Sequence, residues 1–229
     1  MDKKIQLIIF DLDGTLVNAY RAVAASINFT LKKLNCPLQN DETIKRSVGW
    51  GDRNLLSRFV GADQIEPALT IYRRHHAQAL LNGTTFLPGA KKILQDFKKE
   101  GYQLAVASNR PTRFTQIIIR HLKMNRLFNK ILCADKLKAG KPDPSILFTI
   151  IKQLKQKKSE TLYVGDMTID VETGNRAGIP TVAVLTGSST QAEIEKLCPY
   201  RVISNISELK KVLSEINGGK RSDKNPLLR

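Results

Sequence analysis

The stretch IIFDLDGTLV, residues 8–17, decides which fold this sequence favours. Its apolar run, residues 8–10, predicts a buried β-strand, and the run ends in two aspartates, Asp11 and Asp13, followed by Gly14. In an open α/β sheet, ligands bind beyond the carboxyl ends of the strands, which is where this pair falls. An Asp-x-Asp-Gly string can also be a solvated turn. The rest of the chain has to distinguish such a turn from a ligand-binding loop.

The two neighbouring carboxylates predict a cation. They repel each other, and burying them unpaired is costly. A divalent ion would relieve the repulsion. We expect Mg²⁺, because it prefers oxygen ligands and binds through one or two carboxylates together with a substrate phosphate.

The composition is that of an ordinary globular protein. The 229 residues are 41% hydrophobic and 25% charged, enough for one large or two small domains. Cys36, Cys133 and Cys198 are far apart and form no C-x-x-C, which argues against a disulfide framework or a zinc site. No signal sequence and no apolar run of membrane-spanning length is evident, so we expect a cytoplasmic protein without a membrane partner.

The net charge of +16 raises the possibility of nucleic-acid binding. Residues 89–160 carry 17 Lys and Arg against five Asp and Glu, and so supply +12 of this charge. The bases are spread over several predicted helices and are not interleaved with aromatic residues. We therefore interpret them as solvated helix faces that could attract anionic substrates, and regard a nucleic-acid partner as unlikely.

Residues 18–84 predict a helical insert directly after the first strand. Apolar residues recur at helical spacing over 19–34, and further helices are expected over 41–48, 52–60 and 64–81. No convincing strand falls in this region.

From Pro88 the chain alternates between strands and helices. Alternation of this kind predicts βαβ units and a doubly wound, mostly parallel sheet. The expected strands are 103–107, 130–134, 161–165, 180–185 and 200–203, and the expected helices are 89–100, 112–122, 143–155, 170–177, 190–197 and 205–216. The fold class is thus α/β, with a Rossmann-like core of residues 1–17 and 85–217, a helical cap of residues 18–84, and a frayed basic tail of residues 218–229.

Chemically interesting residues follow the other strands as well. Ser108 and Asn109 end the second strand of the core, Lys141 lies in GKPDP after the third, and Asp166 ends the fourth, with Asp170 four residues on. The carboxyl ends of parallel strands meet at one edge of a sheet, so we expect these side chains to share one crevice with the first aspartate pair. Unrelated solvated turns would not produce this convergence.

The motifs DLDGT, ASN, the lysine of GKPDP, and GDMTID resemble, in this order, those of haloacid dehalogenase-like phosphatases, over the whole chain except its tail. The resemblance implies a phosphoryl transfer in two steps. Asp11 would attack phosphorus and form an aspartyl-phosphate, and Asp13 would protonate the leaving oxygen and then activate water. Mg²⁺ would be held by Asp11, Asp166 and the backbone carbonyl of Asp13.

The resemblance also implies how the transferring phosphoryl group is held. Its negative charge would be met by Ser108 and Lys141, helped by Asn109 and by backbone N–H groups near Gly14. Taken singly, these residues have simpler interpretations, because a serine can cap a helix and a lysine can be a surface residue.

Two supporting residues are open to alternatives. Asp170 could belong to the outer shell of the metal, could orient Lys141, or could cap its helix. Thr15 could orient Asp13 by a hydrogen bond, or could cap the turn.

The insert resembles the small cap of the phosphoglycolate phosphatase-like branch. The resemblance implies that this cap closes over the site and contacts the leaving group. Its stretch VGWGDR, residues 48–53, resembles the V-G-x-G string of those enzymes. Trp50 and Arg53 could contact the organic part of the substrate; alternatively, Trp50 packs inside the cap and Arg53 is solvated. His75 and His76 are adjacent on a helix, so they cannot share a face, and we expect surface or partly buried residues without a metal role.

The function that follows is hydrolysis of a small phosphorylated metabolite, a phosphoglycolate-like phosphomonoester, by a monomer or homodimer. Asn18 stands where Asp is usual in phosphoglycolate phosphatases, which weakens the assignment of that substrate but not of the chemistry. A β-phosphoglucomutase-like phosphoryl-transfer mutase shares all these motifs and stays open, and a basic nucleic-acid-binding protein is a weaker alternative. Dehalogenase and phosphonatase activities are disfavoured, because those relatives lack the second aspartate.

Overall fold

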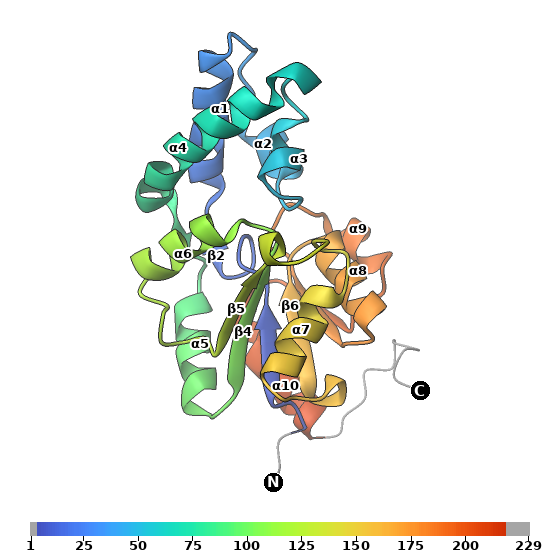
Figure 1. Cartoon of the computed structure of the whole chain (residues 1–229). Coiled ribbons are helices and arrows are strands. Elements are labelled where there is room, and N and C mark those ends of the chain that lie inside the picture. Colours follow the sequence, from blue (N-terminus) through green and yellow to red (C-terminus); the bar gives the residue numbers. More distant parts are fainter. Residues whose placement is uncertain (1–3, 219–229) are drawn as a thin grey trace.

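The computed structural model describes residues 4–218 and contains a six-stranded parallel sheet in the order β5-β4-β1-β6-β7-β8 (Figure 1). The strands are β1 (Leu7–Phe10), β4 (Gln103–Ser108), β5 (Lys130–Cys133), β6 (Thr161–Gly165), β7 (Thr181–Val184) and β8 (Arg201–Ile203). The strand β1 lies between β4 and β6, where Ile9 is in register with Ala105 and Tyr163. All four residues of β1 are buried, as expected for a central strand covered on both faces.

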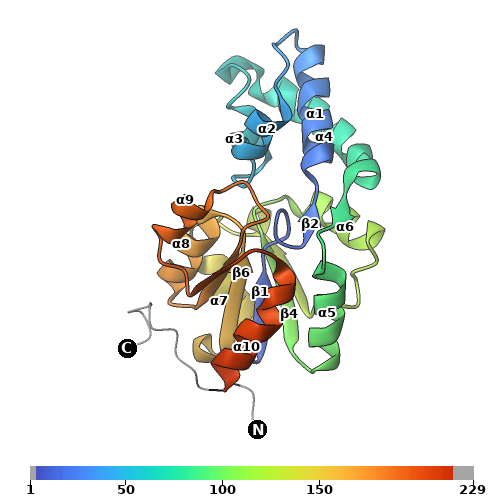
Figure 2. The ribbon, with the colours of Figure 1, turned by 180° about the vertical axis from the view of Figure 1, so that it is seen from behind.

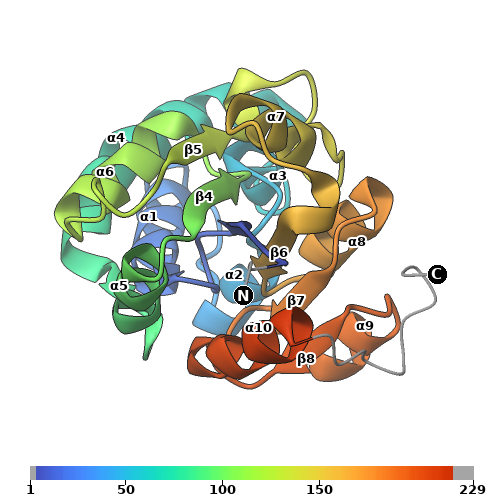
Figure 3. The same ribbon diagram turned by 90° about the horizontal axis from the view of Figure 1, so that it is seen from below.

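Helices cover both faces of the sheet (Figures 2 and 3). Because successive side chains of a strand point to opposite faces, Ile8 and Phe10 pack in one hydrophobic cluster, and Leu7 and Ile9 pack in another. The first cluster includes α5 (Ala90–Lys99), α6 (Thr112–His121) and α10 (Leu209–Asn217). The other face carries α7 (Ser145–Gln153), α8 (Thr168–Ala177) and α9 (Gln191–Glu195).

Residues 20–83 form a separate group of helices above the carboxyl ends of the strands (Figure 1). These helices, which we call the helical segment, are α1 (Tyr20–Lys33), α2 (Asp41–Ser47), α3 (Asp52–Leu56) and α4 (Ile65–Gly83). The long helices α1 and α4 pack against each other. The chain enters and leaves the segment through two short antiparallel strands, β2 (Val17–Asn18) and β3 (Thr85–Phe86).

The predicted α/β fold with a doubly wound parallel sheet is confirmed. The sequence prediction missed the two-residue strands β2 and β3, because two residues are too few to show a period of two. The helix expected over 52–60 ends at Leu56. Apart from Gly218, the predicted basic tail lies outside the described residues. Within residues 4–218, no helix is both long enough and apolar enough to span a bilayer.

Candidate active site

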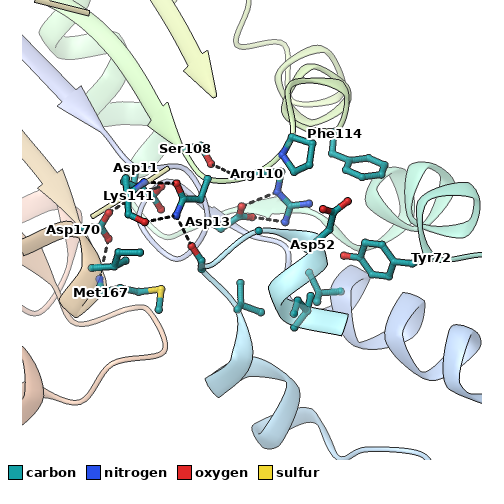
Figure 4. A pocket seen from close by; sticks show the side chains of 18 residues that line it. Asp11, Asp13, Asp52, Tyr72, Ser108, Arg110, Phe114, Lys141, Met167 and Asp170 are labelled. Atoms are coloured by element: carbon teal, nitrogen blue, oxygen red, sulfur yellow. Dashed lines mark hydrogen bonds and ion pairs between the residues drawn. The ribbon is translucent and has the colours of Figure 1, made fainter. Parts of the chain in front are cut away.

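Asp11, the first residue after β1, lies at the bottom of a pocket between the sheet edge and the helical segment (Figure 4). Its Oδ1 accepts a hydrogen bond from the Lys141 ammonium over 2.6 Å. Burial raises the pKa of the Asp11 carboxyl to about 7, although the Lys141 charge opposes this shift. Asp11 is therefore a desolvated carboxylate with one partner, placed where a ligand can reach it.

Lys141 joins two carboxylates. Its Nζ also donates to Asp170 Oδ1 over 2.7 Å and lies 3.2 Å from the Tyr163 hydroxyl, which itself donates to Asp170 Oδ1 over 2.7 Å. Burial alone would lower the pKa of Lys141, but Asp11 and Asp170 outweigh it and hold that pKa well above its usual value. The ammonium thus stays charged inside the protein.

Asp170 owes its position to the first turn of α8. Its Oδ2 accepts from the backbone N–H groups of Asp166 and Met167, over 3.2 and 3.0 Å. Both Asp170 oxygens are therefore occupied by donors of the protein. Two of the alternatives that the sequence left open are both realised, because Asp170 Oδ1 orients Lys141 and Oδ2 caps the first turn of α8.

Asp166 has one oxygen without a partner. It follows β6 and is fully buried, and its Oδ1 accepts from the Thr15 hydroxyl over 2.7 Å. Its Oδ2 is buried with no hydrogen-bond partner among the described residues. Burial, with the nearby negative charge of Asp11, raises the pKa of Asp166 well above its ordinary value. The Thr15 hydroxyl therefore holds Asp166, and the predicted hydrogen bond from Thr15 to Asp13 is not formed.

The surroundings of that free oxygen suit a cation. A Cβ at Gly14 would lie 2.3 Å from Asp166 Oδ2, and one at Gly187 would lie 1.7 Å from it, so only glycines leave this space open. Asp11, Asp166 and Asp170 bring carboxylate oxygens within 4.8 Å of one another. Such an all-oxygen cluster fits a hard divalent ion, and among the described contacts Asp11 and Asp166 each have a protein donor on one oxygen only. The predicted ligation by the Asp13 backbone carbonyl stays a prediction.

The Asp13 side chain turns away from this cluster, towards Arg110 (Figure 4). Arg110 donates from Nε and Nη2 to the two Asp13 oxygens, over 2.7 and 2.9 Å, while its Nη1 lies 2.7 Å from His76 Nε2 on α4. The Arg110 side chain is only 8% exposed. Burial would lower its pKa, but Asp13 more than compensates and raises it.

Sequence reasoning missed Arg110 and was wrong about His76, which is fully buried. Signals for both were present. Arg110 lies two residues beyond Ser108, at the same sheet edge as Asp13. His76 lies four residues from the buried residues Tyr72 and Leu80, which is the spacing of one helix face. His75, in contrast, is partly buried as expected.

The two residues after β4 differ in their contacts. Ser108 is buried, and its Oγ accepts from the Arg110 backbone N–H over 3.1 Å. Asn109 binds three backbone groups: its Nδ2 donates to the Gly49 and Lys141 carbonyls, and its Oδ1 accepts from the Lys141 N–H. Asn109 therefore holds the Lys141 loop and the loop at Gly49 together, and its predicted phosphate contact stays a prediction.

The helical segment supplies the roof of the pocket, but not through the residues expected from the sequence. The segment residues that line the pocket are Val23, Val48, Gly49, Gly51, Asp52, Leu55 and Tyr72. Trp50 and Arg53 are absent from this lining, with Trp50 39% exposed and the Arg53 side chain 58% exposed and paired with Glu66. The arrangement thus gives no support to a specificity role for either residue. Trp50 does not pack inside the segment either.

Comparison with known proteins agrees with this geometry. The family model described as haloacid dehalogenase-like hydrolase matches residues 8–184. The phosphoglycolate phosphatase of Pseudomonas syringae pv. syringae is 32% identical over 213 residues, covering 89% of this chain and 78% of that protein. That of Haemophilus influenzae is 28% identical over 224 residues, covering 93% and 100%. A crystal structure described as a predicted phosphoglycolate phosphatase from Haemophilus somnus superimposes with a TM-score of 0.87 at 27% identity, covering 91% of this chain and 98% of that one.

Proposed function

Because the chain belongs to the haloacid dehalogenase-like hydrolase family and is a phosphoric monoester hydrolase, we propose that it hydrolyses a small phosphoglycolate-like ester through an aspartyl-phosphate on Asp11. The observation that carries the proposal is the buried contact between Asp11 and Lys141 at the sheet edge. A desolvated carboxylate beside a fixed positive charge is suited to attack a phosphate ester and to tolerate the charge that the ester brings.

The reaction divides into two steps. In the first, an Asp11 oxygen attacks phosphorus as the bond to the ester oxygen breaks, and the Asp13 carboxyl gives its proton to that oxygen. In the second, the Asp13 carboxylate takes a proton from a water molecule that attacks the same phosphorus, which releases phosphate and restores Asp11. Asp13 thus acts first as an acid and then as a base.

Lys141 and Ser108 would hold the phosphoryl group. Lys141 is charged and buried, and Ser108 directs a hydroxyl into the same pocket. The charge of a transferring phosphoryl group spreads over its equatorial oxygens, so fixed donors of this kind account for most of the stabilisation of the transition state.

Mg²⁺ would be held by Asp11 and Asp166, because the unpartnered oxygen of Asp166 and the space kept by Gly14 and Gly187 fit a small cation. When bound, the ion would neutralise the clustered carboxylates and polarise a phosphate oxygen.

The helical segment would act as a cap over the reacting groups. The Gly49 carbonyl accepts from Asn109, and Arg46 on α2 pairs with Glu193 on α9, so the segment contacts the core on two sides of the pocket. A covered pocket would exclude bulk water and admit small esters. The named relatives support phosphoglycolate or a close analogue, although Asn18 departs from their usual pattern.

The test is phosphate release from phosphoglycolate and a panel of other phosphorylated metabolites, with Mg²⁺ and with excess chelator. We expect Mg²⁺-dependent release that Asp11→Asn lowers to less than about a hundredth, the loss expected for a covalent nucleophile. Full activity in chelator would remove the metal from the scheme. Isomerisation of a sugar phosphate without phosphate release would identify a mutase.

A further inference from the structure

His76 connects the helical segment to the reacting groups. It lies on α4, whereas Arg110 and Asp13 lie on loops of the core, and the 2.7 Å contact between His76 Nε2 and Arg110 Nη1 crosses between these two parts. His76 is fully buried and stacks on Tyr72, with ring centroids 4.7 Å apart. Its ring is therefore fixed in both position and orientation.

The hydrogen-bond partners determine which nitrogen of His76 carries the proton. Arginine has only donors, so Nε2 must accept from Arg110 and the hydrogen must be on Nδ1. Nδ1 lies 3.0 Å from the Ser26 hydroxyl, which donates its own hydrogen to the Ala22 carbonyl over 2.8 Å. The hydroxyl oxygen keeps two lone pairs, so it can accept from His76 although His75 Nδ1 also lies 3.1 Å from it. The imidazole is thus neutral, in a single tautomer.

A neutral acceptor has a consequence for the charge of Arg110. A second carboxylate at the position of His76 would share the guanidinium with Asp13. His76 is neutral, so it holds the Nη1 side of the Arg110 guanidinium without adding a second negative charge that would compete with Asp13. Both oxygens of Asp13 accept from Arg110, so the guanidinium sets the plane and the direction of the Asp13 carboxyl group.

We propose that His76 is a positioning residue of the reaction: it fixes Arg110, and Arg110 fixes the side chain of Asp13, the group that gives its proton to the leaving oxygen. An acid can act only from within hydrogen-bond distance of the oxygen that it protonates, so an Asp13 side chain that is free to rotate would donate its proton less effectively. The helical segment takes part in the chemistry by this route, because the contact exists only when α4 lies against the core.

The inference is tested with two esters that differ mainly in their need for an acid. 4-Nitrophenyl phosphate and phenyl phosphate have similar shapes, but 4-nitrophenolate leaves without help more readily than phenolate does. The value of kcat/KM for each ester reports the steps up to phosphoryl transfer to Asp11. A loss confined to phenyl phosphate therefore indicates impaired proton donation, whereas a structural defect slows both esters alike.

His76→Phe keeps a ring between its aromatic neighbours but removes the acceptor. We expect it to lower kcat/KM for phenyl phosphate about tenfold, a fraction of the 10²- to 10⁴-fold that an acid contributes, and to leave 4-nitrophenyl phosphate within about threefold. His76→Gln places an amide oxygen near the position of Nε2 and should keep both esters within about threefold. His121→Phe changes an exposed histidine at the end of α6 in the same way; it is the control and should change neither.

Two results would overturn the inference: an equal loss on both esters in His76→Phe, or the same selective loss in His76→Gln. A third check uses Arg110→Ala, because a residue that acts through Arg110 should have no further effect once Arg110 is gone. An additional tenfold loss on phenyl phosphate in the double variant would contradict the inference.

Should His76→Phe fail to fold, as judged by circular dichroism, Ser26→Ala replaces it. That change removes the hydroxyl that orients the His76 ring and that also contacts His75, and it leaves both histidines in place. The same selective loss on phenyl phosphate is expected, and an equal loss on both esters would count against the inference.

The inference rests on the proposed function, and the two can fail separately. A wild-type protein that hydrolyses neither ester, or an Asp11→Asn variant that hydrolyses both, refutes the proposed function. A wild-type protein that hydrolyses both esters, with no selective loss in the variants, refutes only the role of His76.

Discussion

Protonation of His76 should make the stability of the protein fall below neutral pH. Burial, reinforced by the Arg110 charge, lowers the pKa of His76 to about 2, whereas an unfolded histidine has a pKa near 6.5. The unfolded chain therefore binds a proton that the folded protein refuses. The stabilisation is fully present above pH 6.5 and is lost as the pH falls from 6.5 towards 2. Between pH 7.5 and 5.0, one such group lowers the free energy of unfolding by about 2 kcal/mol.

Urea unfolding of His76→Gln and of the wild type, at pH 7.5 and at pH 5.0, measures this change in the free energy of unfolding. Any packing defect of the variant is present at both pH values, so it cancels in the difference between them. We expect the wild type to lose about 2 kcal/mol more than His76→Gln. His121→Gln changes an exposed histidine, keeps His76 with all its contacts, and should lose as much as the wild type. Equal losses in His76→Gln and wild type would show that His76 takes up a proton when folded, which is incompatible with Nε2 as the acceptor for Arg110.

Three further variants test the site. Thr15→Val removes the donor to Asp166 Oδ1 and should raise the Mg²⁺ concentration for half-maximal activity about tenfold or more; an unchanged value would remove Thr15 from the site. Gly187→Ala puts a Cβ 1.7 Å from Asp166 Oδ2 and should cut activity about 100-fold. Gly101→Ala strains the backbone at φ +82° but brings the Cβ within 4 Å of no other atom, and should leave activity unchanged. Trp50→Ala should keep kcat/KM within about threefold for every ester, because Trp50 does not line the pocket, and a changed ranking of esters would restore its predicted role.

The sheet was predictable because its signals are local. An apolar run flanked by polar residues and turns marks a buried strand, and the alternation of strands with helices indicates parallel connections. Once the strands are parallel, their carboxyl ends must share an edge. The gathering of Asp11, Ser108 and Lys141 around one pocket, with Asp166 beside Asp11, follows from the order of the strands, before any side chain is placed.

The contacts among these side chains were not predictable in the same way. Thr15 lies two residues from Asp13, yet its hydroxyl reaches Asp166, which is 151 positions away in the chain. Asn109 lies beside a catalytic candidate, yet it binds backbone groups of two other loops. Such choices depend on rotamers and on the directions of turns, which neither periodicity nor motif spacing records.

The helical segment shows most plainly which features a sequence does not predict. Its helices were predictable from their apolar spacing, but which loop residues face the pocket was not. The glycines at 49 and 51 have φ angles of +113° and +86°, and the loop that they shape directs Asp52 rather than Trp50 towards the pocket. The aromatic residue that drew attention in the sequence therefore lies outside the site.

In the proposed mechanism Asp11 carries the phosphoryl group during turnover. Detection of the phosphorylated aspartate is therefore the decisive measurement. The enzyme is mixed with phosphoglycolate or phenyl phosphate and Mg²⁺, quenched in acid within milliseconds, digested, and analysed by mass spectrometry. We expect a phosphoryl group on the peptide that contains Asp11, and none on that peptide in Asp11→Asn. A phosphoryl group on another residue, or steady turnover with no phosphorylated peptide at any quench time, would contradict the proposed mechanism.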